Sequence, residues 1–150
     1  MSNQNIIKSY VEEAFRTNSF GVLATEGEGK PHACIIAITP IDDFVHLIFA
    51  TYRNTSKYKN LIKNENVTIL FENRSTKSLS QPDITVLTAF GFAKEVNISV
   101  SELVLQAHLS RHPKLESFLL SNDCAIFQVK VNAYQVVRGI EDISWWHIND

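Results

Sequence analysis

Short apolar segments separated by turn residues constrain the fold of this chain more than any other feature of its sequence. Each segment is rich in β-branched, aliphatic or aromatic residues, as strands in a closed sheet are. The predicted strands cover residues 20–25, 31–39, a third segment that begins at Phe44, and then 67–72, 84–96, 124–131 and 134–138. Because turns connect most of them, we predict a mainly β fold, an antiparallel β-barrel with α-helices outside it. A doubly wound parallel sheet would need strands and helices to alternate throughout the chain, and they do not.

A few helices accompany these strands. Apolar residues recur at helical spacing over residues 5–17. A second helix follows the third strand and runs to about Lys63. Ser99 and Glu102 have capping-box spacing, so a further helix is expected to begin beside them and to stop before Pro113.

The connections carry their own signals. The turn over residues 26–29 contains two glycines that can adopt positive φ, and the first three strands are expected to form a meander. Residues 73–83 are polar, contain a proline and are predicted to form a loop. Gly91 lies in the middle of a predicted strand, which indicates a β-bulge or a close backbone approach.

The composition predicts a single domain over residues 1–150 with a sizeable core, because 45% of the residues are hydrophobic and 20% are charged. The net charge of −2, without a basic block, argues against nucleic acid or a membrane surface as a partner. No secretory signal and no apolar run of membrane-spanning length is visible, so a cytoplasmic location is expected. Cys34 and Cys124 each lie in an apolar run, which predicts buried free thiols.

The stretch from Phe44 to Leu61 is the most informative for function. It predicts a buried strand, a polar turn and the start of a helix, with Asn54 as the expected N-cap. The start of a helix offers free N–H groups and a partial positive charge. Hydroxyls and a lysine on that turn predict an anion site, most naturally for a phosphate. The alternative is an ordinary turn with solvated polar residues. The residues concerned are Thr51, Thr55, Ser56 and Lys57.

The order of these elements resembles that of a known family. After the first helix come LATEGEGKPHACIIAIT, FVHLIFATYRNTSKYKNL, NVTILFENR and LTAFGFAKEV. This order is similar to that of the FMN-binding split barrels related to pyridoxamine 5′-phosphate oxidase. The resemblance is closest over residues 5–96, and its most specific part is Ala50-Thr51 followed by Thr55-Ser56-Lys57. It implies a split antiparallel β-barrel of the FMN-binding type.

The resemblance also implies a homodimer with two FMN sites at the subunit interface, and an FMN-dependent oxidoreductase acting on a small-molecule substrate. Thr51, Thr55, Ser56 and Lys57 fall where the family binds the FMN phosphate. The flavin ring would lie along the second strand, beside His32, Ala33, Cys34 and Ile35. Asn73 and Arg74 are candidates for polar contacts to the ring or the ribityl chain. One of Trp145 and Trp146 would cover the partner's flavin, or both would fill the core. No metal site and no catalytic acid or base is assigned.

The chain also departs from the family. Cys34 stands where the oxidase proper carries a phosphate-binding arginine, and the chain's last residues lack the arginine that engages the vitamin substrate. Vitamin B6 oxidation is therefore not expected. Because family members bind different groups, a haem-binding, deazaflavin-binding or non-catalytic flavin-binding barrel is the alternative. His108 and His112 have the i, i+4 spacing that can hold a metal or haem, although two histidines alone predict surface polar residues.

Overall fold

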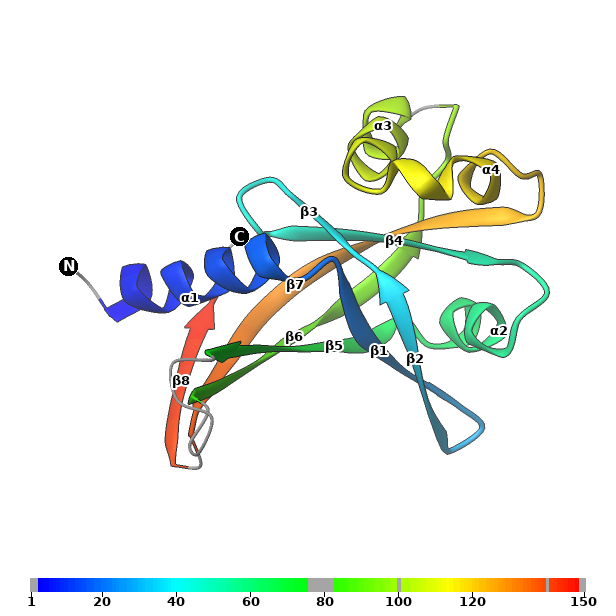
Figure 1. Ribbon diagram of the computed structural model, residues 1–150. Helices are drawn as coiled ribbons and strands as arrows, with labels where there is room; N and C mark the ends of the chain where they lie inside the picture. Colours follow the sequence, from blue (N-terminus) through cyan, green and yellow to red (C-terminus); the bar gives the residue numbers. More distant parts are fainter. Residues whose placement is uncertain (1–2, 76–82, 100, 140, 149–150) are drawn as a thin grey trace.

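The computed structural model describes residues 3–75, 83–99, 101–139 and 141–148, in which eight strands form one curved antiparallel sheet (Figure 1). The strands are β1 (Phe20–Gly27), β2 (Lys30–Ala37), β3 (Thr39–Ile41), β4 (His46–Tyr52), β5 (Asn66–Ser75), β6 (Asp83–Glu95), β7 (Cys124–Arg138) and β8 (Asp142–His147). The helices are α1 (Asn3–Thr17), α2 (Ser56–Lys63), α3 (Glu102–Arg111), the 3₁₀ helix η1 (Pro113–Leu115) and α4 (Glu116–Leu119). None of the described helices is long and apolar enough to cross a membrane.

The joint between β2 and β3 makes the sheet a split barrel. The strand order is β2-β1-β5-β6-β7-β4-β3, with β8 pairing on β7, so β2 and β3 lie at opposite edges although only Ile38 separates them. A sheet whose two edges are joined by one residue must curl back on itself. The expected barrel with outer helices is thereby confirmed. The expected meander is wrong, because Ala37 pairs with Phe20 of β1 whereas Thr39 pairs with Ile48 of β4.

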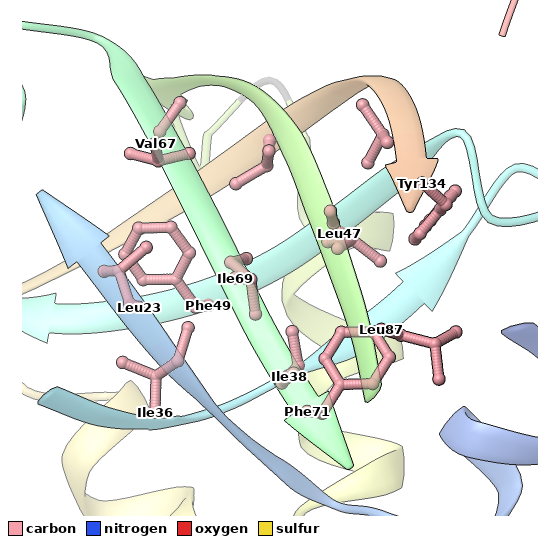
Figure 2. Packing of buried hydrophobic residues seen from close by; sticks show 14 of the residues in the cluster. Leu23, Ile36, Ile38, Leu47, Phe49, Val67, Ile69, Phe71, Leu87 and Tyr134 are labelled. Carbon is pink, nitrogen blue, oxygen red and sulfur yellow. The ribbon is translucent and has the colours of Figure 1, made fainter. Parts of the chain in front are cut away.

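The core lies inside the curl of the sheet and is closed at one end by α1. Ile7, Val11 and Phe15 recur along one side of α1 and are buried. Figure 2 shows how side chains from strands distant in sequence, among them Leu23, Phe49 and Ile69, fill the interior together. A second apolar cluster, which includes Leu105 and Leu119, packs α3 and α4 against the outside of β4 and β7. This packing fixes the helical segment between β6 and β7 beside the end of β4 (Figure 1).

Several predicted boundaries differ from the structure. The two strands expected over 124–131 and 134–138 are one continuous strand, β7, because β4 pairs with its first half and β8 with its second. The strand β8 was not predicted. The predicted loop 73–83 is shorter, since β5 extends to Ser75 and β6 begins at Asp83. The rest of that loop lies outside the described residues.

Two local signals were misassigned. The β1–β2 turn takes its positive φ values from Glu28 and Gly29, at 55° and 78°, while Gly27 stays in β1. The predicted capping box is wrong: α3 begins at Glu102, and the Ser99 hydroxyl donates to Asn97 Oδ1, 2.7 Å away, instead of capping the helix. A side-chain partner two residues back competes with the cap.

Gly91 is the site of a bulge, as predicted. The register between β6 and β7 shifts between Phe90 and Gly91, and a Cβ on Gly91 would lie 2.1 Å from the Lys130 carbonyl oxygen. We therefore expect Gly91→Ala to lower the free energy of unfolding by about 3 kcal/mol, since backbone must move to admit a methyl group. Urea denaturation measures the change. Gly29→Ala is the control, because a Cβ there would meet open space. Its expected loss in the free energy of unfolding is about 1 kcal/mol, the cost of placing an alanine in the left-handed backbone region. Equal losses in the two variants would contradict the close approach.

Candidate functional site

Two threonine hydroxyls hold the turn between β4 and α2. Thr51 Oγ1 lies 3.0 Å from Thr55 Oγ1. Thr55 is the N-cap: its Oγ1 accepts a hydrogen bond from the Tyr58 amide at 3.2 Å and donates one to the Tyr52 carbonyl at 2.9 Å. The Thr51 hydroxyl lies 3.3 Å from the same Tyr52 carbonyl, so either threonine can be the donor in the threonine pair. The predicted N-cap at Asn54 is wrong by one residue.

The first turn of α2 presents unpaired amides. The first N–H groups of a helix have no acceptor within the helix, and Thr55 satisfies only that of Tyr58. The amides of Ser56 and Lys57 have no partner among the residues that the structure describes, so they are available to a ligand or to water. These amides and the partial positive charge of the helix start favour an anion.

A cavity of about 330 Å³ opens beside this turn. Its size falls within the range of about 300–1,000 Å³ that ligand pockets occupy. Thr51, Thr55 and Lys57 line it, so the structure brings together three of the four residues predicted to bind phosphate, while Ser56 is exposed outside the lining. The remaining wall is largely apolar and comes from β1, β2, β4 and the helical segment after β6; it includes Phe20, Ile35, Ala50, Tyr52, Leu115 and Phe118.

Lys57 supplies the cationic side chain of the cavity lining. Within the described part of the chain it has no ion-pair partner. Arg53, which precedes it on the same turn, is engaged elsewhere. Its guanidinium donates to the carbonyls of Asn122 and Cys124 at 2.8 and 3.0 Å and to Glu95 Oε2 at 3.0 Å. Arg53 therefore ties the turn to β6 and β7, and Lys57 remains free to meet an anion.

Two buried histidines lie at the end of α3, and one of them, His108, completes the cavity. His108 lines it but is only 1% exposed, and its Nδ1 lies 2.7 Å from Thr39 Oγ1. His112 Nε2 donates to the Ile38 carbonyl at 2.8 Å, and the two rings are 4.9 Å apart. The interpretation of these residues as surface polar groups is wrong, because the β2–β3 joint supplies buried hydrogen-bond partners for both.

Burial of His108 has a consequence for acid stability. Desolvation, together with the nearby His112 and Arg111, lowers the pKa of His108 to about 3. Below pH 6.5 the unfolded chain therefore binds a proton that the folded chain does not, so acid removes stability. We expect this group to lower the free energy of unfolding by about 2 kcal/mol between pH 7 and pH 5. Urea denaturation at both pH values measures it. In His108→Gln, which does not titrate, the loss should be smaller by that amount; an unchanged loss would contradict the assignment.

The residues predicted to lie along the flavin ring divide between the two faces of β2. Ala33 and Ile35 are exposed, and Ile35 lines the cavity. His32 and Cys34 point the other way, where Cys34 packs against the core. His32 Nδ1 is the one side-chain nitrogen or oxygen among the described residues that is buried without a hydrogen-bond partner.

The other predicted residues lie far from the cavity. Asn73 pairs with Thr85 near the end of β5, and the side chain of Arg74 lies outside the part of the chain that the structure describes. Trp145 and Trp146 are on β8. Trp146 stacks on Tyr134 with ring centroids 5.4 Å apart and packs against the core, whereas Trp145 is 40% exposed.

The length of β7 shows how far apart the two regions are. Thr51 pairs with Ala125 and Trp146 pairs with Tyr134. The stretch of β7 between those partners spans roughly 30 Å at about 3.3 Å per residue. In keeping with this separation, none of the residues that line the cavity comes from β8. No three His, Cys, Asp or Glu side chains lie together as a metal site within the residues described above.

The curled antiparallel sheet, the helical segment between β6 and β7 and the cavity at the start of α2 define a split β-barrel protein. A sequence model described as pyridoxamine 5′-phosphate oxidase matches residues 7–135, so the chain belongs to that family. The resemblance drawn from the sequence is confirmed. A search of curated proteins finds no match.

Solved structures show the same fold at low sequence identity. A heme binding protein from Mycobacterium smegmatis has a TM-score of 0.81 and 16% identity; the match covers 93% of this chain but 57% of that one. A protein from Clostridium acetobutylicum related to general stress protein 26 has a TM-score of 0.76 and 13% identity, with 98% and 97% covered. An FAD-binding protein from Mesorhizobium loti has a TM-score of 0.72 and 13% identity, with 93% and 96% covered.

Proposed function

We propose that this protein is an FMN-dependent oxidoreductase that acts on a small-molecule substrate. The observation that carries the proposal is the convergence of Thr51, Thr55 and Lys57 on one cavity at the start of α2. Membership of the pyridoxamine 5′-phosphate oxidase family and the likeness to an FAD-binding protein support it. Two free thiols, Cys34 and Cys124, fit a cytoplasmic location, where a reducing environment keeps them so.

The residues at this turn fit a phosphate monoester. Lys57 offers a positive charge, and the amides of Ser56 and Lys57 offer two further donors. The hydroxyl hydrogen of Thr51 can rotate from Thr55 or the Tyr52 carbonyl to a phosphate oxygen. These groups would hold FMN by its phosphate and leave its ring to be placed by the apolar wall.

The strand β2 fits the polar edge of a flavin ring. Among the described strands it pairs only with β1, so the backbone groups on its other side are open. Ile35 on this strand also lines the cavity. FMN, when bound, supplies hydride or electron transfer, and this chain supplies the position and the electrostatics.

A homodimer is part of the proposal. Ile35, Val22 and Leu70 are register partners across β2, β1 and β5, and Ile35 and Leu70 are 72% and 43% exposed. An apolar row of this kind on the outer face of a sheet suits a second copy of the chain. A partner would also place a tryptophan near a cavity that the chain's own β8 does not reach. Leu70→Asp should convert a dimer to monomers in sedimentation velocity; a wild-type monomer would exclude the dimer.

Titration of the protein with FMN and with riboflavin, followed by flavin fluorescence, tests the proposal. We expect one FMN per chain at micromolar affinity and clearly weaker binding of riboflavin, which lacks the phosphate. Equal affinity for the two flavins, or none for either, would contradict a phosphate site at α2. A substrate screen is justified only by the first result.

Haem binding is a second candidate, and the position of His108 in the cavity wall favours it. His112 is less suited because its Nε2 is already bonded to the Ile38 carbonyl. Titration with haemin separates the two candidates. A Soret band that shifts on binding and is lost in His108→Gln would favour haem over FMN.

A further inference from the structure

His108 is the feature of the cavity that phosphate binding at α2 does not by itself explain. It is a nearly inaccessible polar side chain in the wall of a largely apolar cavity. Burying an imidazole is costly unless its nitrogens are hydrogen-bonded. Its two nitrogens therefore need to be accounted for separately.

One ring nitrogen is satisfied by the fold. Nδ1 lies 2.7 Å from Thr39 Oγ1, at the first residue of β3. Further hydrogen bonds tie the end of α3 to the residue before Thr39. His112 binds the Ile38 carbonyl, and the Arg111 guanidinium donates to the carbonyls of Ile38 and Asn18 at 3.0 and 2.8 Å. The position of the His108 ring is thus fixed before any ligand arrives.

The other ring nitrogen is open. Nε2 makes no hydrogen bond to any residue that the structure describes. It is nevertheless not completely closed off by protein, because His32 Nδ1 is the one fully buried side-chain nitrogen or oxygen without a partner among those residues. Because Nδ1 is taken up by Thr39 and His108 lines the cavity together with Thr51, Thr55 and Lys57, we infer that Nε2 is the ring nitrogen that faces the cavity. A fixed ring nitrogen without a hydrogen-bond partner among the described residues, on a side chain that is only 1% exposed, is evidence for a ligand in this cavity that is independent of the helix start.

We propose that His108 Nε2–H donates a hydrogen bond to the phosphate group bound at α2, while the Thr39 hydroxyl holds the ring by donating to Nδ1 in the tautomer that can do so. This inference rests on the proposed FMN function. It adds His108 as a ligand-binding residue and Thr39 as the residue that positions the His108 ring. An ionised phosphate presents only acceptors, so Nε2 must carry the hydrogen and Thr39 must donate to Nδ1. The low pKa of His108 agrees with a ring that stays neutral.

The first test uses the wild-type protein. Long-range ¹H–¹⁵N NMR spectra of the histidine rings report which nitrogen carries the hydrogen, before and after titration with inorganic phosphate. We expect the Nε2–H tautomer of His108 and a shift of its Nε2 signal with phosphate. The Nδ1–H tautomer in the presence of phosphate, or a signal that phosphate leaves unchanged, would overturn the inference.

The second test compares flavins across variants. In His108→Phe we expect FMN affinity to fall about tenfold to a hundredfold while riboflavin affinity is unchanged, as for the loss of a hydrogen bond to a charged group. His108→Gln should recover part of the FMN affinity. The control is His46→Phe at the opposite end of β4, where Nδ1 binds Asp42 Oδ2 on the surface; it should bind FMN as the wild type does.

The outcomes separate this inference from the proposed function. If the wild type prefers FMN and His108→Phe, still folded by circular dichroism, keeps that preference, the inference is wrong and the proposed function stands. If the wild type does not prefer FMN to riboflavin, the proposed function fails and the inference fails with it.

Discussion

Phe49→Ala is expected to lower the free energy of unfolding by about 4 kcal/mol, the largest stability effect that we predict. Phe49 is 0% exposed and its ring is parallel to that of Phe127, with centroids 5.3 Å apart and 6° between the planes. Removing a fully buried aromatic ring costs about 3–5 kcal/mol, because the cavity left behind collapses only in part. Figure 2 shows the Phe49 ring packed among the core side chains, beside Leu23. Urea denaturation followed by circular dichroism measures the loss.

Leu103→Ala is the control for this substitution. Leu103 lies on α3 and is 86% exposed, so its truncation should change the free energy of unfolding by no more than about 0.5 kcal/mol. A loss below 1 kcal/mol in Phe49→Ala would mean that β4 does not form the centre of the core.

Lys57→Ala is expected to weaken FMN binding by about tenfold to a hundredfold, as large an effect on binding as any that we predict. Lys57 lines the cavity, whereas Arg53 beside it is engaged by Glu95 and by two carbonyls. Losing a charge-assisted contact to phosphate removes about 1.5–3 kcal/mol. Riboflavin affinity should not change, because riboflavin has no phosphate. Fluorescence titration with the two flavins measures both values.

Lys59→Ala provides the matched control, since Lys59 is exposed on the same helix and does not line the cavity. It should bind FMN as the wild type does. If both variants lose the same modest amount of FMN affinity, long-range attraction explains it and no specific contact at Lys57 is needed.

The parts of the structure that could be predicted from sequence depend on contacts that are local in the chain. The strand, turn and helix around Thr51–Lys57 follow from apolar patterning and from a capping residue, and the bulge follows from Gly91. The N-cap was misplaced by one residue because Asn54 and Thr55 are both good caps. The structure selects Thr55, whose hydroxyl contacts Thr51 and Tyr52.

The parts that could not be predicted depend on tertiary partners. Nothing local indicates that Ile38 joins two edges of the sheet, since a turn between neighbouring strands would look the same. The buried state of His108 and His112 follows from that joint, which provides Thr39 Oγ1 and the Ile38 carbonyl. The i, i+4 spacing marked the two histidines as a pair, but only the fold shows that one faces the cavity. Phe20, Leu115 and Phe118 also line the cavity, but in the sequence they are only apolar residues and nothing marks them as part of a site.

The pairing of β4 with β7 determines when the cavity can form. Phe49 pairs with Phe127 and Thr51 with Ala125, partners that lie far apart along the chain, and α3 and α4 reach the cavity only by packing on these two strands. Loop-closure entropy makes such distant pairings late events in folding. During synthesis the turn at Thr55 leaves the ribosome well before the strand that must pack beside it. Ligand capture by a growing chain must therefore wait until β7 has emerged, and retention of the ligand would report a completed barrel.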